Sequence, residues 1–313
     1  MDKLNYIVKR LLQMIPVLAI VIVLVFVLIR LIPGDPAMIM LGSKVKPEVL
    51  EGYRQRMGYY EPLPTQFLYF LRDLAHFDFG ESVHFHMPVT EVIKSRFGVT
   101  FALTVFSSIL TIIISLPLGY LAGMKQNKLP DQAVRAGTLL GMALPSFWIG
   151  LMLLMVFGVK LGWFPVSGYG ASVSEHIRSL TLPSLTMAIS ASSVVIRNTR
   201  NNIADTKNQD YVFFARGKGL TSARISLAHI IRNAVIPTVT LLSMRIAYMF
   251  GGSVIIESVF SLPGMGELLL NSVLRRDYAV VQGAVITFVM IILLINLITD
   301  LLYSAVDPRI SLR

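Results

Sequence analysis

Six long apolar stretches restrict what this chain can fold into. They lie at residues 11–31, 99–124, 136–158, 179–198, 236–260 and 280–304. A helix needs about 20 residues to cross the hydrocarbon core of a bilayer, and each stretch reaches that length. Because 54% of the residues are hydrophobic and 15% are charged, the sequence predicts an all-α polytopic membrane protein embedded in a lipid bilayer. Neighbouring helices tolerate interior prolines, so kinked spans are expected at Pro16, Pro117, Pro145 and Pro183.

The distribution of lysine and arginine among the connections predicts the orientation. Basic residues concentrate in the N-terminal segment, residues 125–135, residues 197–232 and the C-terminal tail. The short connections on the opposite side hold Lys160, Arg178, Arg275 and Arg276. Positively charged connections face the cytoplasm, so both termini are expected there. The same bias explains the net charge of +10, and no nucleic-acid partner is expected.

The connection after the first span, residues 32–98, is much longer than the others. It is predicted to be an extracytoplasmic insertion that folds as a small appendage, with Pro47–Gln55 and Gln66–His76 as candidate helices. The first of these can begin with proline at its first helical position. Asp35 stands between glycine and proline and is interpreted as a turn residue. With no internal repeat or linker, residues 1–313 are expected to form a single transmembrane domain.

The segment between the fourth and fifth stretches is conspicuously basic. Within it, Arg216, Lys218, Arg224 and Arg232 each disfavour bilayer depth by roughly 2.5–3.5 kcal/mol, which predicts an aqueous loop. Gly219 can cap one short helix, and Thr221 or Ser222 can begin a second. We therefore expect residues 199–235 to form a cytoplasmic helical hairpin that docks another protein. The alternative is a solvated positive loop that only sets the topology.

Motifs for nucleotide hydrolysis and for hydrolytic catalysis are absent from the sequence. There is no G-x-x-x-x-G-K-[ST] segment, no G-x-S-x-G elbow and no H-E-x-x-H helix. The absence of cysteine excludes disulfides and thiolate metal sites. His84 and His86 alternate in the insertion without a third ligand at suitable spacing, so they are interpreted as exposed loop residues. The chain is not expected to be an enzyme or to carry a cofactor or metal of its own.

Ionisable residues and glycines within the fifth stretch are candidates for a solute path. Arg245 lies deepest, and it can contact an anionic solute or pair with a carboxylate of another helix. Glu257 lies near the outer end and is interpreted first as a boundary residue, like Asp300 in the sixth stretch. Gly251 and Gly252 allow close helix packing or a bend, and close packing is preferred.

The basic hairpin resembles the EAA loop of ABC-importer permeases, in the version found in the dipeptide, oligopeptide and nickel branch. The matching residues are Asp210-Tyr211-Val212, Ala215 to Leu220, His229, Arg232-Asn233-Ala234 and Ile236-Pro237. Further matches cover nearly the whole chain in order: residues 30–36, 162–168, 251–260, 263–266, 276–278, 281–283, 300–303 and 307–309.

This resemblance implies a type I importer permease of the bacterial inner membrane, the first of two permease subunits. Its expected partners are a second, similar permease, two cytoplasmic ATPase subunits that bind ATP and magnesium, and an extracytoplasmic solute-binding protein. The residues implied in ATPase coupling are Asp210, Tyr211, Phe213, Phe214, Ala215, Arg216, Lys218, Gly219, Leu220, Arg232 and Pro237. Phe213 occupies the position of the broader family's glutamate, so the contact is expected to depend on aromatic packing and on Arg216 or Lys218. Pro237 is expected to close the second hairpin helix.

Several alternatives remain open from the sequence. Di- and oligopeptides are the first expectation for the solute, and the same machinery can carry nickel, a metal–chelator complex or glutathione. A secondary transporter is the alternative from a different class, but it requires ion-coupling carboxylates deep in a span, which this sequence does not offer. A membrane-embedded enzyme is a third class, and the chain lacks the paired catalytic residues that it would need.

Overall fold

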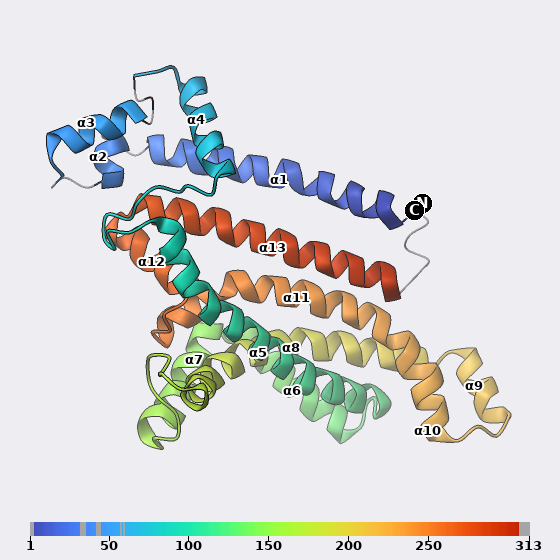
Figure 1. Ribbon diagram of the computed structural model, residues 1–313. Helices are drawn as coiled ribbons and strands as arrows, with labels where there is room; N and C mark the ends of the chain where they lie inside the picture. The colour runs from blue at the N-terminus through green and yellow to red at the C-terminus, as the bar shows by residue number, and fades with distance from the viewer. Residues whose placement is uncertain (1–2, 32–35, 42–44, 57, 59, 307–313) are drawn as a thin grey trace. The chain divides into compact units, whose positions relative to one another are not determined.

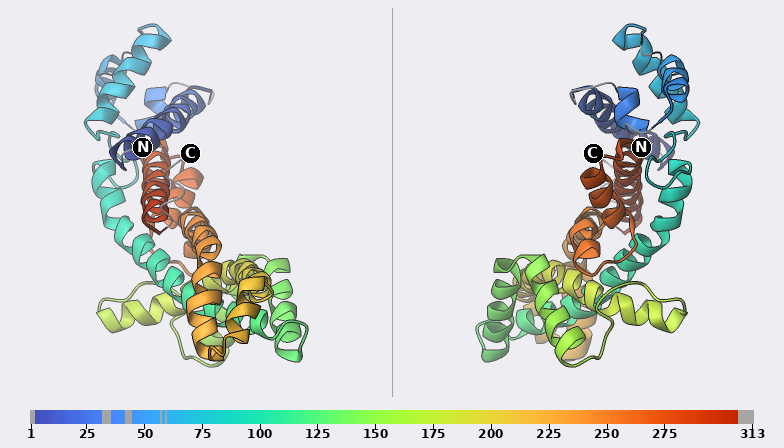
Figure 2. Two further views of the ribbon diagram at one scale, coloured as in Figure 1. Left: turned by 90° about the vertical axis from the view of Figure 1, so that its right-hand side faces the viewer. Right: turned by 90° about the vertical axis from the view of Figure 1, so that its left-hand side faces the viewer.

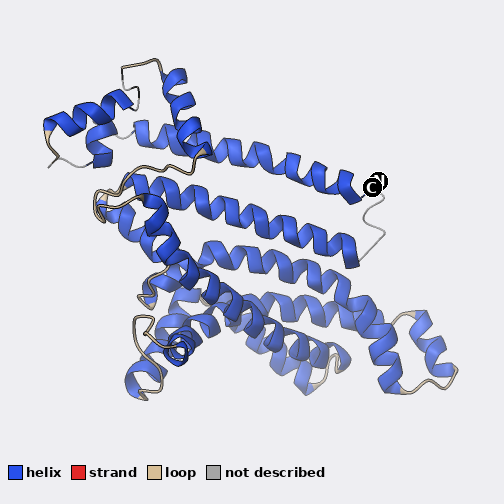
Figure 3. Ribbon diagram, viewed as in Figure 1, coloured by secondary structure: helices blue, strands red, loops and turns tan. Residues whose placement is uncertain are grey.

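The computed structural model describes residues 3–31, 36–41, 45–56, 58 and 60–306, and these are almost entirely helical (Figures 1 and 3). No strand is assigned within them; the nearest feature is an isolated bridge between Glu81 and Pro88. The chain divides into two compact units. The first holds Phe101–Leu262 and the chain from Ile295, and the second holds the chain up to Thr100 together with Pro263–Leu294. The predicted all-α class is confirmed.

Five helices are long and apolar enough to cross a membrane. They are α1 (Lys3–Leu31), α5 (Val89–Met124), α8 (Val173–Lys207), α11 (Arg232–Val259) and α13 (Tyr278–Val306). Each coincides with a predicted span, but their ends extend further. Figure 2 shows α5 as one uninterrupted ribbon, which begins ten residues before the predicted start at residue 99. Apolarity marks the part of a helix at bilayer depth, whereas hydrogen bonding continues the helix into polar sequence on either side.

The expected third span, residues 136–158, is not one kinked helix. It is divided into α6 (Leu129–Ala143) and α7 (Ser146–Leu153), and α7 continues into the π-helical segment η1 (Leu154–Lys160); the two parts are bent by 104°. Leu144 is extended, with ψ of 133°, because the ring of Pro145 disfavours helical geometry in the residue before it. The pair forms a broken span or a re-entrant loop. In contrast, α1, α5 and α8 continue through Pro16, Pro117 and Pro183.

The insertion contains the two expected helices and one that was not expected. The helix α3 (Pro47–Arg56) begins at its proline, and α4 (Leu63–Ala75) begins three residues before the predicted start. The short helix α2 (Pro36–Leu41) was missed, and Asp35 lies outside the described residues. The helix α4 packs on α1, where the ring of Phe26 lies 5.0 Å from Phe67 and 5.7 Å from Phe70.

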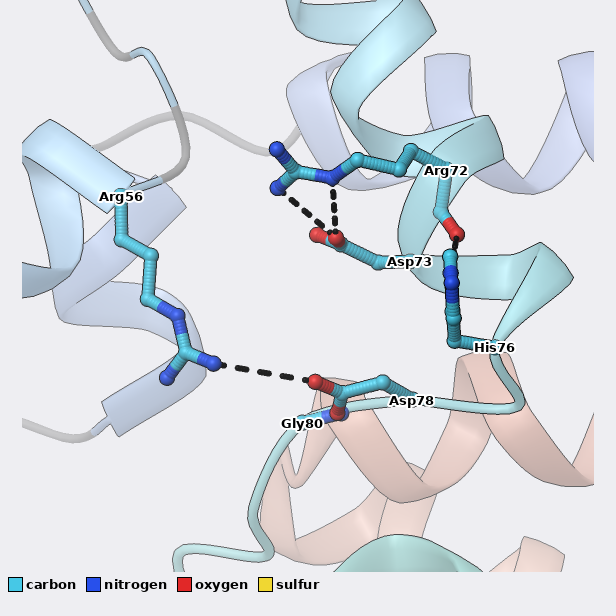
Figure 4. A network of polar contacts seen from close by, with 6 residues as sticks. All are labelled: Arg56, Arg72, Asp73, His76, Asp78 and Gly80. Carbon is cyan, nitrogen blue, oxygen red and sulfur yellow. Dashed lines mark hydrogen bonds and ion pairs between the residues drawn. The ribbon is translucent and has the colours of Figure 1, made fainter.

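A polar network fixes the chain that leaves α4 (Figure 4). Asp78 accepts a hydrogen bond from the backbone N–H of Gly80 at 2.9 Å and lies 3.8 Å from the guanidinium of Arg56 on α3. In the last turn of α4, the guanidinium of Arg72 donates hydrogen bonds to Asp73. Burial, with a smaller contribution from the negative charge of Asp78, raises the pKa of Tyr53 to about 12. Arg56 and Asp78 therefore link α3 to the segment after α4 at the exposed surface of the appendage.

In the first unit, α8 is the central helix; α6, α7 and α11 pack around it, and α5 approaches it at two glycines. Small residues allow close approach between α5 and α8. A Cβ atom added to Gly119 would lie 2.6 Å from Thr199 Cβ, and one added to Gly123 would lie 2.6 Å from Ile203 Cβ. Real Cβ contacts this short are essentially absent from proteins. The glycines at these two positions, one helical turn apart, let the backbones meet.

Candidate functional site

The expected hairpin follows α8 directly. After a turn at Asn208 and Gln209 come α9 (Asp210–Gly217), a second turn, α10 (Ser222–Ile225) and the π-helical segment η2 (Ser226–Ile231). Figure 1 shows α9 and α10 projecting together beyond the ends of α8 and α11, and contacts between them join the two arms. Two short helices in this segment are therefore confirmed.

The predicted caps of the hairpin helices are also confirmed. Gly219 has φ of +78°, a left-handed conformation that glycine adopts at little cost, and its N–H donates to the carbonyl of Arg216 at 2.9 Å. Thr221 begins α10, and its hydroxyl accepts the N–H of Arg224 at 3.4 Å. Local sequence therefore determines the turn between the two arms.

The second arm of the hairpin does not end where the sequence predicted. Helical geometry continues from α10 through η2 into α11, and Pro237 lies inside α11. The expectation that Pro237 closes the hairpin helix is wrong. The neighbouring Thr238 links this part of α11 to α8: its hydroxyl donates to the carbonyl of Ala234 at 2.9 Å and accepts from Asn202 of α8 at 3.3 Å. The second arm of the hairpin and the fifth span are thus one continuous helix, with a π-helical turn at their junction.

The inner side of the hairpin is apolar and packs on the helix bundle. Its core consists of Ile203, Val212, Ala215, Ile225, Ile230 and Ala234, with Tyr120, Met124 and Leu220 partly buried against it. Two of the predicted coupling residues, Ala215 and Leu220, therefore support this packing rather than the outer surface.

Polar contacts reinforce the same junction. The hydroxyls of Tyr120 on α5 and Ser226 in η2 lie 2.5 Å apart, and the ammonium of Lys207 donates to the carbonyl of Met124 at 2.8 Å. Asn233 donates to the Tyr211 hydroxyl at 3.0 Å, which joins the two arms. These contacts join the hairpin and its neighbouring segments to α5, α8 and α11.

The outer side of the hairpin exposes large apolar residues beside cations. Phe213 is 54% exposed, Phe214 71% and Leu227 67%. The exposed side chains of Arg216 and Lys218 lie on the same arm as the two phenylalanines. Asp210, Tyr211, Arg232 and Pro237 are exposed as well. Aromatic and apolar groups next to arginine are typical of protein interfaces, and their exposure in an aqueous loop favours a docking surface over a solvated linker.

The structure does not bring the candidate solute-path residues together on one surface. Arg245 is partly exposed on α11, whereas Glu257 is completely buried, two residues before the end of α11 at Val259. Gly251 and Gly252 are exposed, and a Cβ atom added to Gly252 would meet nothing within 4 Å. Close packing at Gly252 within this chain is therefore wrong. Arg245 forms no ion pair among the described residues, so pairing with a carboxylate of this chain is not supported.

Two buried carboxylates were not identified as structural residues from the sequence. Asp131 on α6 accepts two hydrogen bonds from the guanidinium of Arg200 on α8, at 2.7 and 3.0 Å. In the second unit, Asp277 accepts the Ser82 hydroxyl at 2.5 Å and the N–H of His84 at 3.2 Å. Each carboxylate lies near a helix start, where acidic residues are common. Their partners lie 69 and 195 residues away in the sequence, so neighbouring residues do not indicate the pairing.

Comparisons with known proteins agree with this architecture. Residues 115–312 match the family described as "Binding-protein-dependent transport system inner membrane component", and residues 3–104 match its N-terminal family. The glutathione transport system permease protein GsiC of Salmonella typhimurium (strain LT2) is 40% identical over 307 residues, which cover 98% of this chain and 99% of the relative. GsiC of Escherichia coli (strain K12) is 39% identical over the same length and coverage.

Solved structures show the same fold at lower identity. A chain of the methionine ABC transporter MetNI, in an inward-facing conformation, matches with a TM-score of 0.57 and 16% identity over 70% of this chain and 97% of that chain. A chain of an amino acid ABC transporter crystallised with histidines matches with a TM-score of 0.53 and 20% identity, over 70% of this chain and 94% of that one. Both confirm the expected type I permease fold.

These matches confirm the resemblance of the chain to ABC-importer permeases and exclude the secondary-transporter and membrane-enzyme alternatives, since the relatives are permease subunits of importers and not enzymes. Family membership explains three observations together: the six apolar stretches, the hairpin between α8 and α11, and the likeness to relatives over the full length. The chain belongs to the family of binding-protein-dependent transport system inner membrane components and is a membrane-spanning permease subunit of a bacterial ABC importer.

Proposed function

We propose that this permease forms half of a path for small peptides and that glutathione, a tripeptide, is the first solute to test. The observation that carries this proposal is the likeness to glutathione permeases along essentially the whole chain, at 40% identity. Nickel and metal–chelator complexes are less favoured because the relatives at this identity are named for glutathione transport.

The solute is tested by uptake in a bacterial strain that lacks its own glutathione and peptide importers. The chain is expressed with its cognate permease, ATPases and binding protein, and uptake of radiolabelled glutathione, a dipeptide, a pentapeptide and Ni²⁺ is compared. Unlabelled glutathione is expected to reduce the uptake of labelled glutathione and to leave the uptake of Ni²⁺ unchanged. Uptake of Ni²⁺ alone would overturn the assignment to peptides.

The same proposal assigns the partners. A second permease completes the path, two cytoplasmic ATPases bind ATP and magnesium, and an extracytoplasmic binding protein delivers the solute. The exposed outer side of the hairpin, with Phe213, Phe214 and Arg216, enters a cleft on one ATPase. This places both termini and the hairpin in the cytoplasm, in agreement with the positive charge of those segments.

The hairpin contact is tested by crosslinking. Cysteine is absent from the chain, so a single cysteine placed at Phe214 or, as a control, at Trp163 gives this subunit one thiol at a known position. A crosslink from position 214 to an ATPase is expected, and its yield should change when ATP is added. Equal crosslinking from both positions would show that the hairpin is not the docking site.

A further inference from the structure

We propose that a cavity between α6 and α8 binds the phosphate-bearing headgroup of an anionic phospholipid. The cavity has a volume of about 390 Å³ and lies near the end of α8 that leads into the hairpin. This volume falls in the range of small-ligand sites, about 300–1,000 Å³. The site is separate from the outer side of the hairpin, and its proposed occupant is neither the transported solute nor the ATPase.

The walls of the cavity come from two helix faces with the same spacing. On α6 they are residues 134, 135, 138 and 139, and on α8 they are residues 196, 197, 200 and 201. Positions separated by one, four and five residues lie on one side of a helix, so each set forms one face. The cavity lies between these two faces. The turn at Gln126 and Asn127 contributes to the lining as well.

The lining is cationic and contains no carboxylate. Arg135, Arg197 and Arg200 all line the cavity. Arg200 is neutralised by Asp131, which also accepts the backbone N–H of Asn127 at 2.8 Å. Arg135 and Arg197 have no carboxylate within ion-pair distance in the part of the chain that the structure describes. Two guanidinium groups without an ion-pair partner, beside the Asp131–Arg200 pair, match the charge and the hydrogen-bonding capacity of a phosphate group.

The apolar rim favours a lipid over free phosphate. Leu139 lines the cavity and is 60% exposed, one turn beyond Arg135 along α6. Leu140 and Met142, further along α6, are also exposed. A headgroup between the two arginines would have its acyl chains along these residues, an arrangement that free phosphate cannot use. Basic pockets between helices at the cytoplasmic surface are suited to anionic lipids.

The proposal is tested on the full chain, purified in a neutral detergent, by titration with fluorescent phosphatidylglycerol. The variant Arg135→Gln/Arg197→Gln removes both free cations and leaves the Asp131–Arg200 pair in place. The matched control Lys125→Gln/Lys128→Gln removes the same charge from exposed residues near the same turn that do not line the cavity. We expect about fivefold weaker binding for each arginine, or roughly 30-fold for the double variant, and a small change for the control.

Competing lipids and anions identify the source of the phosphate. Unlabelled phosphatidylglycerol should displace the probe, whereas phosphatidylcholine and millimolar inorganic phosphate should not. Displacement by inorganic phosphate would overturn the lipid assignment in favour of a free-anion site. Equal loss in both double variants would show diffuse attraction rather than a site, and loss of binding on assembly with the other subunits would show that a partner fills the cavity. A thermal melt of each variant confirms that weaker binding reflects the site and not unfolding.

Discussion

The close approach of α5 to α8 makes a quantitative prediction for Gly123. A methyl group added there would lie 2.6 Å from Cβ and Cγ2 of Ile203 and 2.8 Å from the backbone carbonyl oxygen of Arg200. Rotation of the Ile203 side chain can move Cγ2, but its Cβ atom and the carbonyl oxygen are fixed to the helix backbone and can move only if α8 moves. Overpacking of this kind typically destabilises a protein by about 1–3 kcal/mol.

The control for Gly123→Ala is Gly137→Ala. Gly137 also lies within a helix, α6, but a Cβ atom added there would meet nothing within 4 Å. Both changes gain the same intrinsic helix preference, about 1 kcal/mol, so the difference in stability between the two variants isolates the overpacking.

The two variants are compared by thermal unfolding of the purified chain in one detergent. We expect Gly137→Ala to be at least as stable as the wild type and Gly123→Ala to be less stable than Gly137→Ala by about 1–3 kcal/mol. At about 2–4 °C per kcal/mol, this is a difference of several degrees in melting temperature. Equal melting temperatures would refute the close approach of α5 and α8 at this turn.

Four further predictions concern the hairpin and the insertion. Phe213→Ala should uncouple transport more than Phe213→Glu, because glutamate restores the residue of the broader family; equal solute uptake in both variants would contradict this. Tyr120→Phe removes the hydroxyl that lies 2.5 Å from that of Ser226 and should destabilise the hairpin junction by about 1 kcal/mol. Hydrogen exchange of the η2 amides should become faster. Unchanged exchange would mean that the contact does not stabilise the junction. Gly219→Ala places a Cβ atom on a residue in a left-handed conformation, with φ of +78°, and should destabilise the hairpin by about 1–2 kcal/mol. The expected result is faster proteolysis in the hairpin. Gly217→Ala is the control, because position 217 has an open environment and no positive φ. Because the pKa of Tyr53 is raised from 10.0 to about 12, folding favours its neutral form, so its contribution to stability is present below pH 10 and lost as the pH rises towards 12; Tyr53→Phe should remove this alkaline step from the pH dependence of melting.

Much of the hairpin was predictable because its signals are local. The left-handed Gly219 and the N-terminal cap at Thr221 each depend on a few neighbouring residues, and both were found where expected. Which residues of the hairpin are buried and which are exposed could not be predicted from the sequence. Ala215 is buried and Phe214 is exposed because the tertiary contacts of α9 with α8 and α11 determine which face turns inward.

The prolines show where local reasoning fails. Pro145 stands at a 104° break, whereas Pro183 and Pro237 lie within continuous helices. All three lack a backbone N–H and crowd the preceding turn, so their local chemistry is the same. The difference lies in the surroundings, since a helix continues through proline when neighbouring groups support the freed backbone.

The sequence by itself determined the class of the protein, its apolar spans and the basic segment that cannot lie in a bilayer. These follow from transfer free energies that each residue contributes almost independently of the fold. The tertiary structure decided which polar groups meet. Asp131 bonds to Arg200 and Glu257 is buried within its unit because helices distant in sequence pack together there. Pairing of this kind depends on three-dimensional proximity, which no spacing along the chain encodes.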